Sequence, residues 1–199
     1  MYSVPQDRMG PKNEIVELLK AWAGTTLAFA ILLRSPQRDL PEALLLAGVT
    51  VALGIIGHEL AHRAVARYFG CWARFIANDA MLVLAILMAF TGFLFAAPGA
   101  VWHSGYISKR QSGLIAAAGP ATNMVLAIIC LALIQILPFG TRLWSFVWAG
   151  YTLNAWLGLF NMIPFGPLDG AKVLNWSGAA FAVLAGLGLF LVFGVPRLL

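Results

Sequence analysis

Two histidines four residues apart, with a glutamate beside the first, are the residues of this sequence best suited to chemistry. They are His58, Glu59 and His62. On a helix, residues i and i+4 lie on one face one turn apart, so both imidazoles can reach one metal ion. The Glu59 carboxylate would then lie close enough to take a proton from a water on that ion, whose pKa zinc lowers to roughly 7. The pattern predicts a Zn²⁺ site of the metalloprotease type.

The bland alternative is a pair of core histidines beside a chance glutamate. That alternative would bury Glu59 and two imidazoles in an apolar helix without a partner, at a cost on the order of several kcal/mol. Of the eight acidic residues, only Glu59 and Asp169 are attached to apolar sequence of membrane depth, where an ionisable group indicates a functional site. The other six belong to the N-terminal region, loops or segment ends: Asp7, Glu14, Glu17, Asp39, Glu42 and Asp79.

A catalytic zinc ion uses three protein ligands and one open position, so a third ligand is required. Tyr68 stands six residues after His62, where a metzincin has its next histidine, and no glutamate follows Glu59. Asp79, His103 and Asp169 remain as candidates.

Asp169 is the best of these candidates. Pro164 and Pro167 precede it, and they break a helix and free the backbone to aim a carboxylate. His103 stands in a loop-like stretch and is the second choice. Asp79 lies at the polar edge of a segment, where an unpaired, solvated carboxylate is the simpler interpretation.

The composition requires a membrane around this site. The chain has 199 residues, of which 61% are hydrophobic and only 11% charged, and its mean hydropathy is +0.85. Soluble domains carry about 25% charged residues, so a water-soluble globular domain is excluded. The 13 Lys and Arg residues give a net charge of +5, but they are scattered between apolar runs, which argues for loop topology and against a nucleic-acid partner. Cys71 and Cys130 lack CxxC spacing and are expected to be buried, inert thiols.

The apolar runs predict an all-α integral membrane protein, a single polytopic domain over residues 1–199. At about 20 residues per span, the length allows five to six apolar segments in a transmembrane helix bundle. The first segment could instead be a signal peptide, but no small-x-small cleavage site follows it, and we favour an uncleaved span. The runs are 15–33, 43–57 continuing into the histidine pair, 80–97, 113–137, 143–163 and 176–195.

Three motifs in order resemble those of the site-2 protease family of intramembrane zinc metalloproteases. They are HExxH at residues 58–62, GPxxN at 119–123 and NxxPxxxLDG at 161–170. The resemblance implies cleavage of a transmembrane protein substrate by regulated intramembrane proteolysis. It also implies His58, His62 and Asp169 as zinc ligands, Glu59 as general base, and Asn161 as a residue that holds the substrate or the oxyanion.

The chain departs from larger members of that family in two ways. It leaves no room for a PDZ domain, so it would be a small member without one. It also has the apolar run 80–97 where the family usually has a re-entrant β-hairpin.

The small-residue stretch before Asn123 has two interpretations. It can simply allow close helix packing, or the Pro120 kink can shape a cavity into which Asn123 donates. For Asn161, the alternative to an oxyanion role is that its amide satisfies a carbonyl freed by the prolines. The stretch 97–102 is a candidate backbone edge for an extended substrate, the alternative being a surface loop.

Zinc geometry decides the expected topology. If the N-terminus is cytoplasmic, His58 to His62 lie near the cytoplasmic end of the second span, and Asp169 must reach the same depth. Only one full crossing then fits between the motifs, and we expect a re-entrant segment near residues 80–104. This arrangement places nine Lys and Arg inside and four outside, against eight and five if the run spans. The expected location is the cell membrane.

Two other functions compete with proteolysis. A catalytically silent zinc-binding membrane protein could sequester or scaffold membrane partners, and His103 as a fourth ligand would favour it, since structural sites are closed by four ligands. A metal transporter is weaker, because the sequence offers one site and no inverted repeat.

Overall fold

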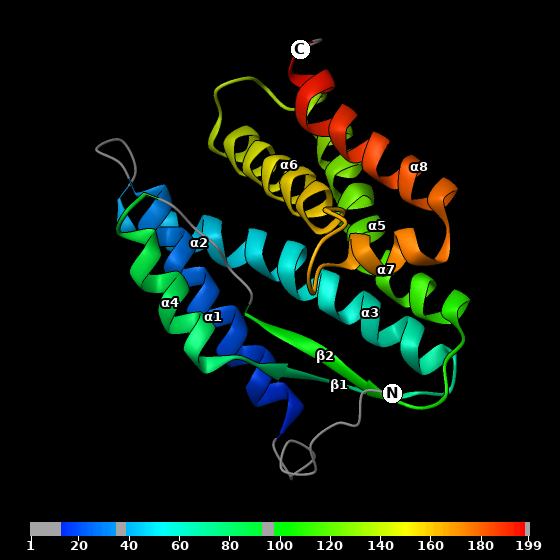
Figure 1. The fold of residues 1–199 in the computed structure, drawn as a ribbon. Helices are drawn as coiled ribbons and strands as arrows, with labels where there is room; N and C mark the ends of the chain where they lie inside the picture. Colours follow the sequence, from blue (N-terminus) through cyan, green and yellow to red (C-terminus); the bar gives the residue numbers. More distant parts are fainter. Residues whose placement is uncertain (1–12, 35–38, 93–97, 198–199) are drawn as a thin grey trace.

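The computed structural model describes residues 13–34, 39–92 and 98–197, which are mostly helical (Figure 1). The helices are α1 (Glu14–Leu33), α2 (Leu40–Val51), α3 (Gly57–Tyr68), α4 (Asp79–Ala89), α5 (Lys109–Ile134), α6 (Arg142–Asn161), α7 (Asp169–Trp176) and α8 (Gly178–Leu189). Two strands, β1 (Trp72–Ala77) and β2 (Gly99–Ser104), pair antiparallel. The all-α expectation therefore omits a short β-hairpin.

Four helical stretches among the described residues are long and apolar enough to cross a membrane. These are 14–33, 40–68, 109–134 and 178–197. The expected run 143–163 forms α6, which has 20 residues but is not among the four. The lipid bilayer is thus the environment of this protein. The described residues contain four candidate spans, and the five to six segments expected from the sequence remain a prediction.

The helix that carries the histidines contains a π turn just before them. Residues Ala52–Ile56 adopt it and join α2 to α3 in one continuous helix. Such single π turns are rare and occur often at functional sites. Helix α3 ends at Tyr68, and Gly70, with φ of +77°, lets the chain turn into β1.

Helix α4 lies between the two strands in sequence. Ala77, the last residue of β1, is paired with Gly99, the first residue of β2. The chain therefore leaves the hairpin and returns to it at the same level. With 11 residues, α4 is about 16 Å long, which is short against a hydrocarbon core of about 30 Å.

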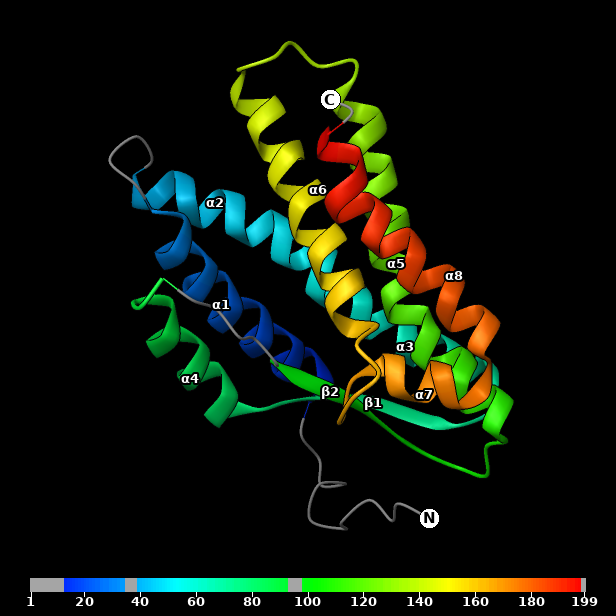
Figure 2. The ribbon, with the colours of Figure 1, turned by 45° about the horizontal axis from the view of Figure 1, so that its top comes forward.

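Several elements gather at one end of the molecule, as Figure 1 and Figure 2 both show. They are the start of α1, the end of α3, both strands, the start of α5, the end of α6, and α7. The turn from α5 to α6 and the C-terminus lie at the opposite end, and α5 and α6 run side by side. A core that includes Met124 of α5, Tyr151 of α6 and Leu191 of the π turn after α8 holds this half together.

Candidate metal centre

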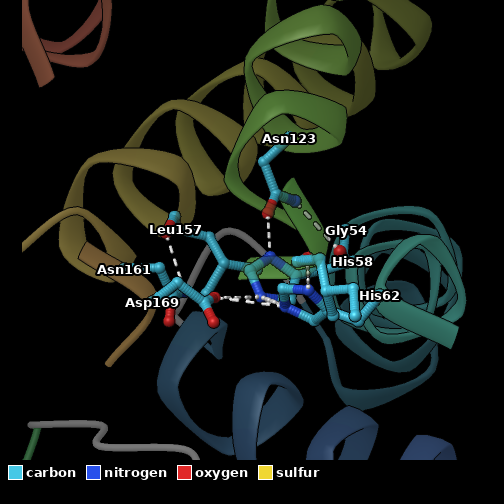
Figure 3. A network of polar contacts seen from close by, with 8 residues as sticks. Gly54, His58, His62, Asn123, Leu157, Asn161 and Asp169 are labelled. Carbon is cyan, nitrogen blue, oxygen red and sulfur yellow. Dashed lines mark hydrogen bonds and ion pairs between the residues drawn. The ribbon is translucent and has the colours of Figure 1, made fainter. Parts of the chain in front are cut away.

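Three buried side chains from two helices converge on one point (Figure 3). His58 and His62 lie on one face of α3, and Asp169 is the first residue of α7. Nε2 of His58 and Nε2 of His62 are 3.0 Å apart, and they lie 3.3 and 3.1 Å from Oδ2 of Asp169. In the part of the chain that the structure describes, this is the only group of three or more His, Cys, Asp or Glu residues able to share a metal ion.

The second ring nitrogen of each histidine is fixed by a hydrogen bond. Nδ1 of His62 lies 2.7 Å from the carbonyl oxygen of Ile115, which can only accept, so this nitrogen carries the proton. Nδ1 of His58 lies 2.5 Å from Oδ1 of Asn123. Each neutral ring then presents an unprotonated Nε2 to the centre, as a metal ligand requires.

The donor set fits zinc. Ligands at 2.0–2.1 Å in a tetrahedron lie about 3.3 Å from one another, close to the three separations measured between the two histidine nitrogens and the aspartate oxygen. Two nitrogen lone pairs and a carboxylate oxygen at such distances repel unless a cation lies among them. Gly119 of α5 adds a further constraint, because a Cβ there would collide with Nε2 of both histidines. This clash explains why the GPxxN segment begins with glycine.

Asn123 is held by two acceptors, which leaves its oxygen for His58. Its Nδ2 donates to the carbonyl oxygen of Gly54 in the π turn at 3.0 Å and to Oδ1 of Asn154 on α6 at 2.9 Å. Both asparagine side chains are essentially fully buried. The expectation that Asn123 donates into a cavity is therefore wrong, since its amide N–H groups are taken and its oxygen accepts from His58.

The sequence reasoning missed Asn154. It lies seven residues before Asn161 on α6, two turns along the same helix. A buried asparagine inside an apolar run was a signal that could have revealed it.

Glu59 lies beside the three converging side chains but is not one of them. It is partly exposed on α3, and the backbone amide of Val101 in β2 lies within hydrogen-bonding reach of its carboxylate. The carboxylate thus stands between the centre and the edge of a strand.

The helix break before Asp169 occurs as the prolines predict. Helix α6 ends at Asn161 and α7 begins at Asp169, with Pro164 and Pro167 in the intervening turn. Gly170 packs against the carbonyl of Met162, where a Cβ would not fit. Nδ2 of Asn161 donates to the carbonyl of Leu157 at 2.9 Å, one turn back on its own helix (Figure 3).

The two remaining ligand candidates lie outside the cluster. His103 is on β2, and burial together with the charge of Lys172 lowers the pKa of its imidazole. Asp79 is exposed as expected, but it is not unpaired, because Nζ of Lys20 lies 2.7 Å from its Oδ1. Both cysteines are free thiols, with Cys71 buried and Cys130 half-buried.

Sequence comparison identifies relatives with a common description. The chain is 35% identical over 188 residues to "Putative zinc metalloprotease MJ0611" of Methanocaldococcus jannaschii, covering 92% of this chain and 96% of that protein. It is 32% identical over 147 residues to "Putative zinc metalloprotease YwhC" of Bacillus subtilis, covering 64% of this chain and 66% of that protein. A third relative, "Putative zinc metalloprotease Rip3" of Mycobacterium tuberculosis, is 34% identical over 149 residues, which are 70% of this chain and 33% of that protein.

No protein-family model and no solved structure matches the chain. The likeness to the archaeal relative extends over nearly the full length of both proteins. The metal of the present protein is Zn²⁺, in agreement with the names of its relatives. The chain belongs to this family of zinc metalloproteases.

Proposed function

We propose that this protein is an intramembrane zinc metalloprotease of the site-2 protease type. It hydrolyses a peptide bond within or near a transmembrane segment of a membrane protein substrate. The observation that carries the proposal is the convergence of Asp169 of α7 on His58 and His62, which lie with Glu59 on a helix that is apolar and long enough to cross a membrane.

His58, His62 and Asp169 would hold the zinc ion and leave one position open for chemistry. Zinc, when bound, supplies a Lewis acid that polarises the scissile carbonyl and acidifies water. Glu59 accepts the proton of the attacking water and returns it to the leaving amine. Asn161 retains a second amide N–H besides the one bonded to Leu157, and this N–H serves the oxyanion or the extended substrate.

Substrate handling requires an unwound peptide, because a helical carbonyl is already hydrogen-bonded within its own helix. Strand β2 supplies a backbone edge to which an extended segment can be added. The amide of Val101 lies on that edge beside Glu59, so an added strand runs past the general base. Of the proposed edge residues, Ala97 lies outside the described residues, and 99–102 belong to β2.

The direction of each helix across the membrane is inferred from which helix termini lie at the same end of the molecule. With the N-terminus cytoplasmic, α1, α5 and α8 run outward, while α2–α3 and α6 run inward. The close pairing of α6 with α5 supports α6 as a fifth crossing. The segment containing α4 enters the membrane and returns to the same side, because the strand residues before and after it, Ala77 and Gly99, are paired with each other. The cell membrane is the proposed location.

The test is hydrolysis in proteoliposomes. Purified protein is incubated with a panel of single-span membrane proteins, and products are identified by mass. The wild-type protein cleaves at least one substrate within or near its transmembrane segment, whereas Glu59→Gln retains zinc and loses activity by about 10²- to 10⁴-fold, the contribution of a general base. Equal cleavage by both proteins would remove Glu59 as the base.

The alternative is a catalytically silent protein that binds zinc and sequesters or scaffolds membrane partners. Complexes with substrates that stay intact in the wild-type protein, with full zinc content, would favour it. A closed site with four protein ligands would also favour it, but His103 lies outside the cluster of three in the described residues.

A further inference from the structure

The two outer edges of the β1–β2 hairpin differ in their hydrogen bonds to the rest of the chain. Phe75 N donates to Oε1 of Glu14 at 3.0 Å, and Ala77 N donates to Oε2 of Glu17 at 3.1 Å. Both acids belong to the first turn of α1. Glu17, expected among the peripheral acids, has an exposed fraction of 4%. It is therefore a buried carboxylate at the start of a membrane-spanning helix, and the proposed chemistry does not use it.

The spacing of these two acids matches that of the strand. Side chains at i and i+3 of a helix lie about 5–6 Å apart, and alternate residues of a strand are separated by about 7 Å. The first turn of α1 thus presents two acceptors in the positions that the carbonyls of a third strand would take. Arg67 of α3 completes the edge, since its Nε and Nη2 donate to the carbonyl of Ala73 at 3.1 and 2.8 Å.

Ion pairs anchor this arrangement to neighbouring elements. The Glu14 carboxylate lies 3.4 Å from Nη1 of Arg63 and 3.6 Å from Nη2 of Arg67. Oε1 of Glu17 lies 3.2 Å from Nζ of Lys20, which also pairs with Asp79 at the start of α4. The carboxylates are charged partners of α3 and α4 as well as backbone acceptors for β1.

The strand register shows which backbone groups of β2 point away from β1 and are directed toward an added strand. Phe75 donates away from β2 and is paired with Val101, so the two form a non-hydrogen-bonded pair and Val101 points its own N–H away from β1. Gly99 and His103, paired with Ala77 and Ala73, follow the same rule. Within the described residues, no backbone group of another segment is hydrogen-bonded to these outward groups of β2. The Val101 amide instead faces the Glu59 carboxylate, so an added strand has to take that amide over from Glu59.

We propose that Glu14 and Glu17 are positioning residues that cap the outer edge of β1 and so direct an extended substrate to β2. The inference rests on the proposed proteolytic function. Without the cap, a peptide could add to either edge, and one added to β1 would lie about three strand spacings, roughly 14 Å, from the productive position. Such binding is unproductive, because Glu59 faces β2.

The cap itself is tested without substrate, by amide hydrogen exchange in detergent. In the wild-type protein, the amides of Phe75 and Ala77 are protected although they are on a sheet edge. In Glu14→Ala with Glu17→Ala they exchange about tenfold faster or more, as expected for loss of hydrogen bonds to charged groups. The single variants Glu14→Gln and Glu17→Gln, which keep an acceptor oxygen, retain most of the protection. Glu42→Ala on α2 is the matched control and changes nothing at β1.

Direction of the substrate is tested by photo-crosslinking in a Glu59→Gln background. A single-span substrate with a photoreactive residue near its cleavage site attaches to residues 99–104 when the cap is intact. Removing both acids adds attachment to residues 72–77, while zinc content stays the same. Attachment to β1 with the cap intact, or to β2 alone without it, overturns the proposal.

Kinetics separate misdirection from simple damage. If both edges bind equally, half the bound substrate is misplaced, and kcat and KM each fall about twofold while kcat/KM is unchanged. A loss in kcat/KM with unchanged KM would mean a structural role only, and would contradict the proposal. If the wild-type protein cleaves nothing, the proposed protease function fails, whereas exchange and crosslinking still decide whether the cap exists.

Discussion

Oδ1 of Asn123 lies 2.5 Å from Nδ1 of His58, and this contact joins α5 to α3 at the metal centre. Asn123 is on α5, His58 on α3, and Asn154 on α6 orients the Asn123 amide. An asparagine with both N–H groups on other acceptors can only accept from His58, which sets the tautomer of the ring. Metal affinity therefore depends on residues that do not touch the metal.

Replacing Asn123 tests this dependence. Asn123→Ala should weaken zinc binding about 10- to 100-fold, because the orienting partner of His58 is lost. Zinc retention is measured by competition with a chelator, with Thr152→Ala on the exposed face of α6 as control. Unchanged retention in Asn123→Ala would mean that the ring is oriented by packing alone.

Removal of any ligand should abolish or severely weaken zinc binding. His58→Ala, His62→Ala and Asp169→Ala each leave two ligands of three, and the binding free energy depends on the complete set. His103→Ala should keep its zinc, because His103 lies outside the cluster. Metal analysis of the purified variants measures this. Full occupancy in Asp169→Ala, or loss in His103→Ala, would reverse the assignment.

Proline substitutions at adjacent residues of β2 should distinguish the outer edge of the strand from the edge that pairs with β1. Val101→Pro removes an amide that points away from β1 and faces Glu59. We therefore expect the hairpin and zinc to remain and cleavage to fall at least tenfold, through loss of substrate pairing and of the contact with Glu59. Ala100→Pro is the contrasting variant, because Ala100 forms a hydrogen-bonded pair with Ile76 and its loss should disrupt the hairpin. Initial rates and zinc content are measured together. Undiminished cleavage by Val101→Pro would exclude this edge from the mechanism.

Asn161 should serve turnover more than metal binding. Asn161→Ala is expected to keep zinc and fold, and to lose about 10²- to 10³-fold in kcat, the usual effect of removing an oxyanion donor. The competing explanation is local, since its amide already bonds the Leu157 carbonyl. Near-normal turnover would leave it with that structural role. Loss of zinc would instead mean that Asn161 orients Asp169.

The local parts of the site could be predicted from sequence. His58 and His62 share a face because four residues make about one helical turn. Pro164 and Pro167 end α6 because proline lacks an amide donor and obstructs the preceding turn. The membrane environment followed from composition, since so few charged residues cannot cover a soluble domain. These features depend on backbone periodicity and residue chemistry over a few positions.

The relationships between distant segments were decided only by the tertiary structure. Packing of α5 against α3 and α6 brings Asn123 and Asn154 to His58, and it occupies the amide that the sequence suggested was free. The hairpin register turns Val101 toward Glu59, and α1 seats Glu17 on the other edge. Spacing along the chain carries no information on such contacts, because they depend on which helix faces meet and on which direction each strand amide points. The same reason explains why Glu17 looked peripheral in sequence yet is buried against β1.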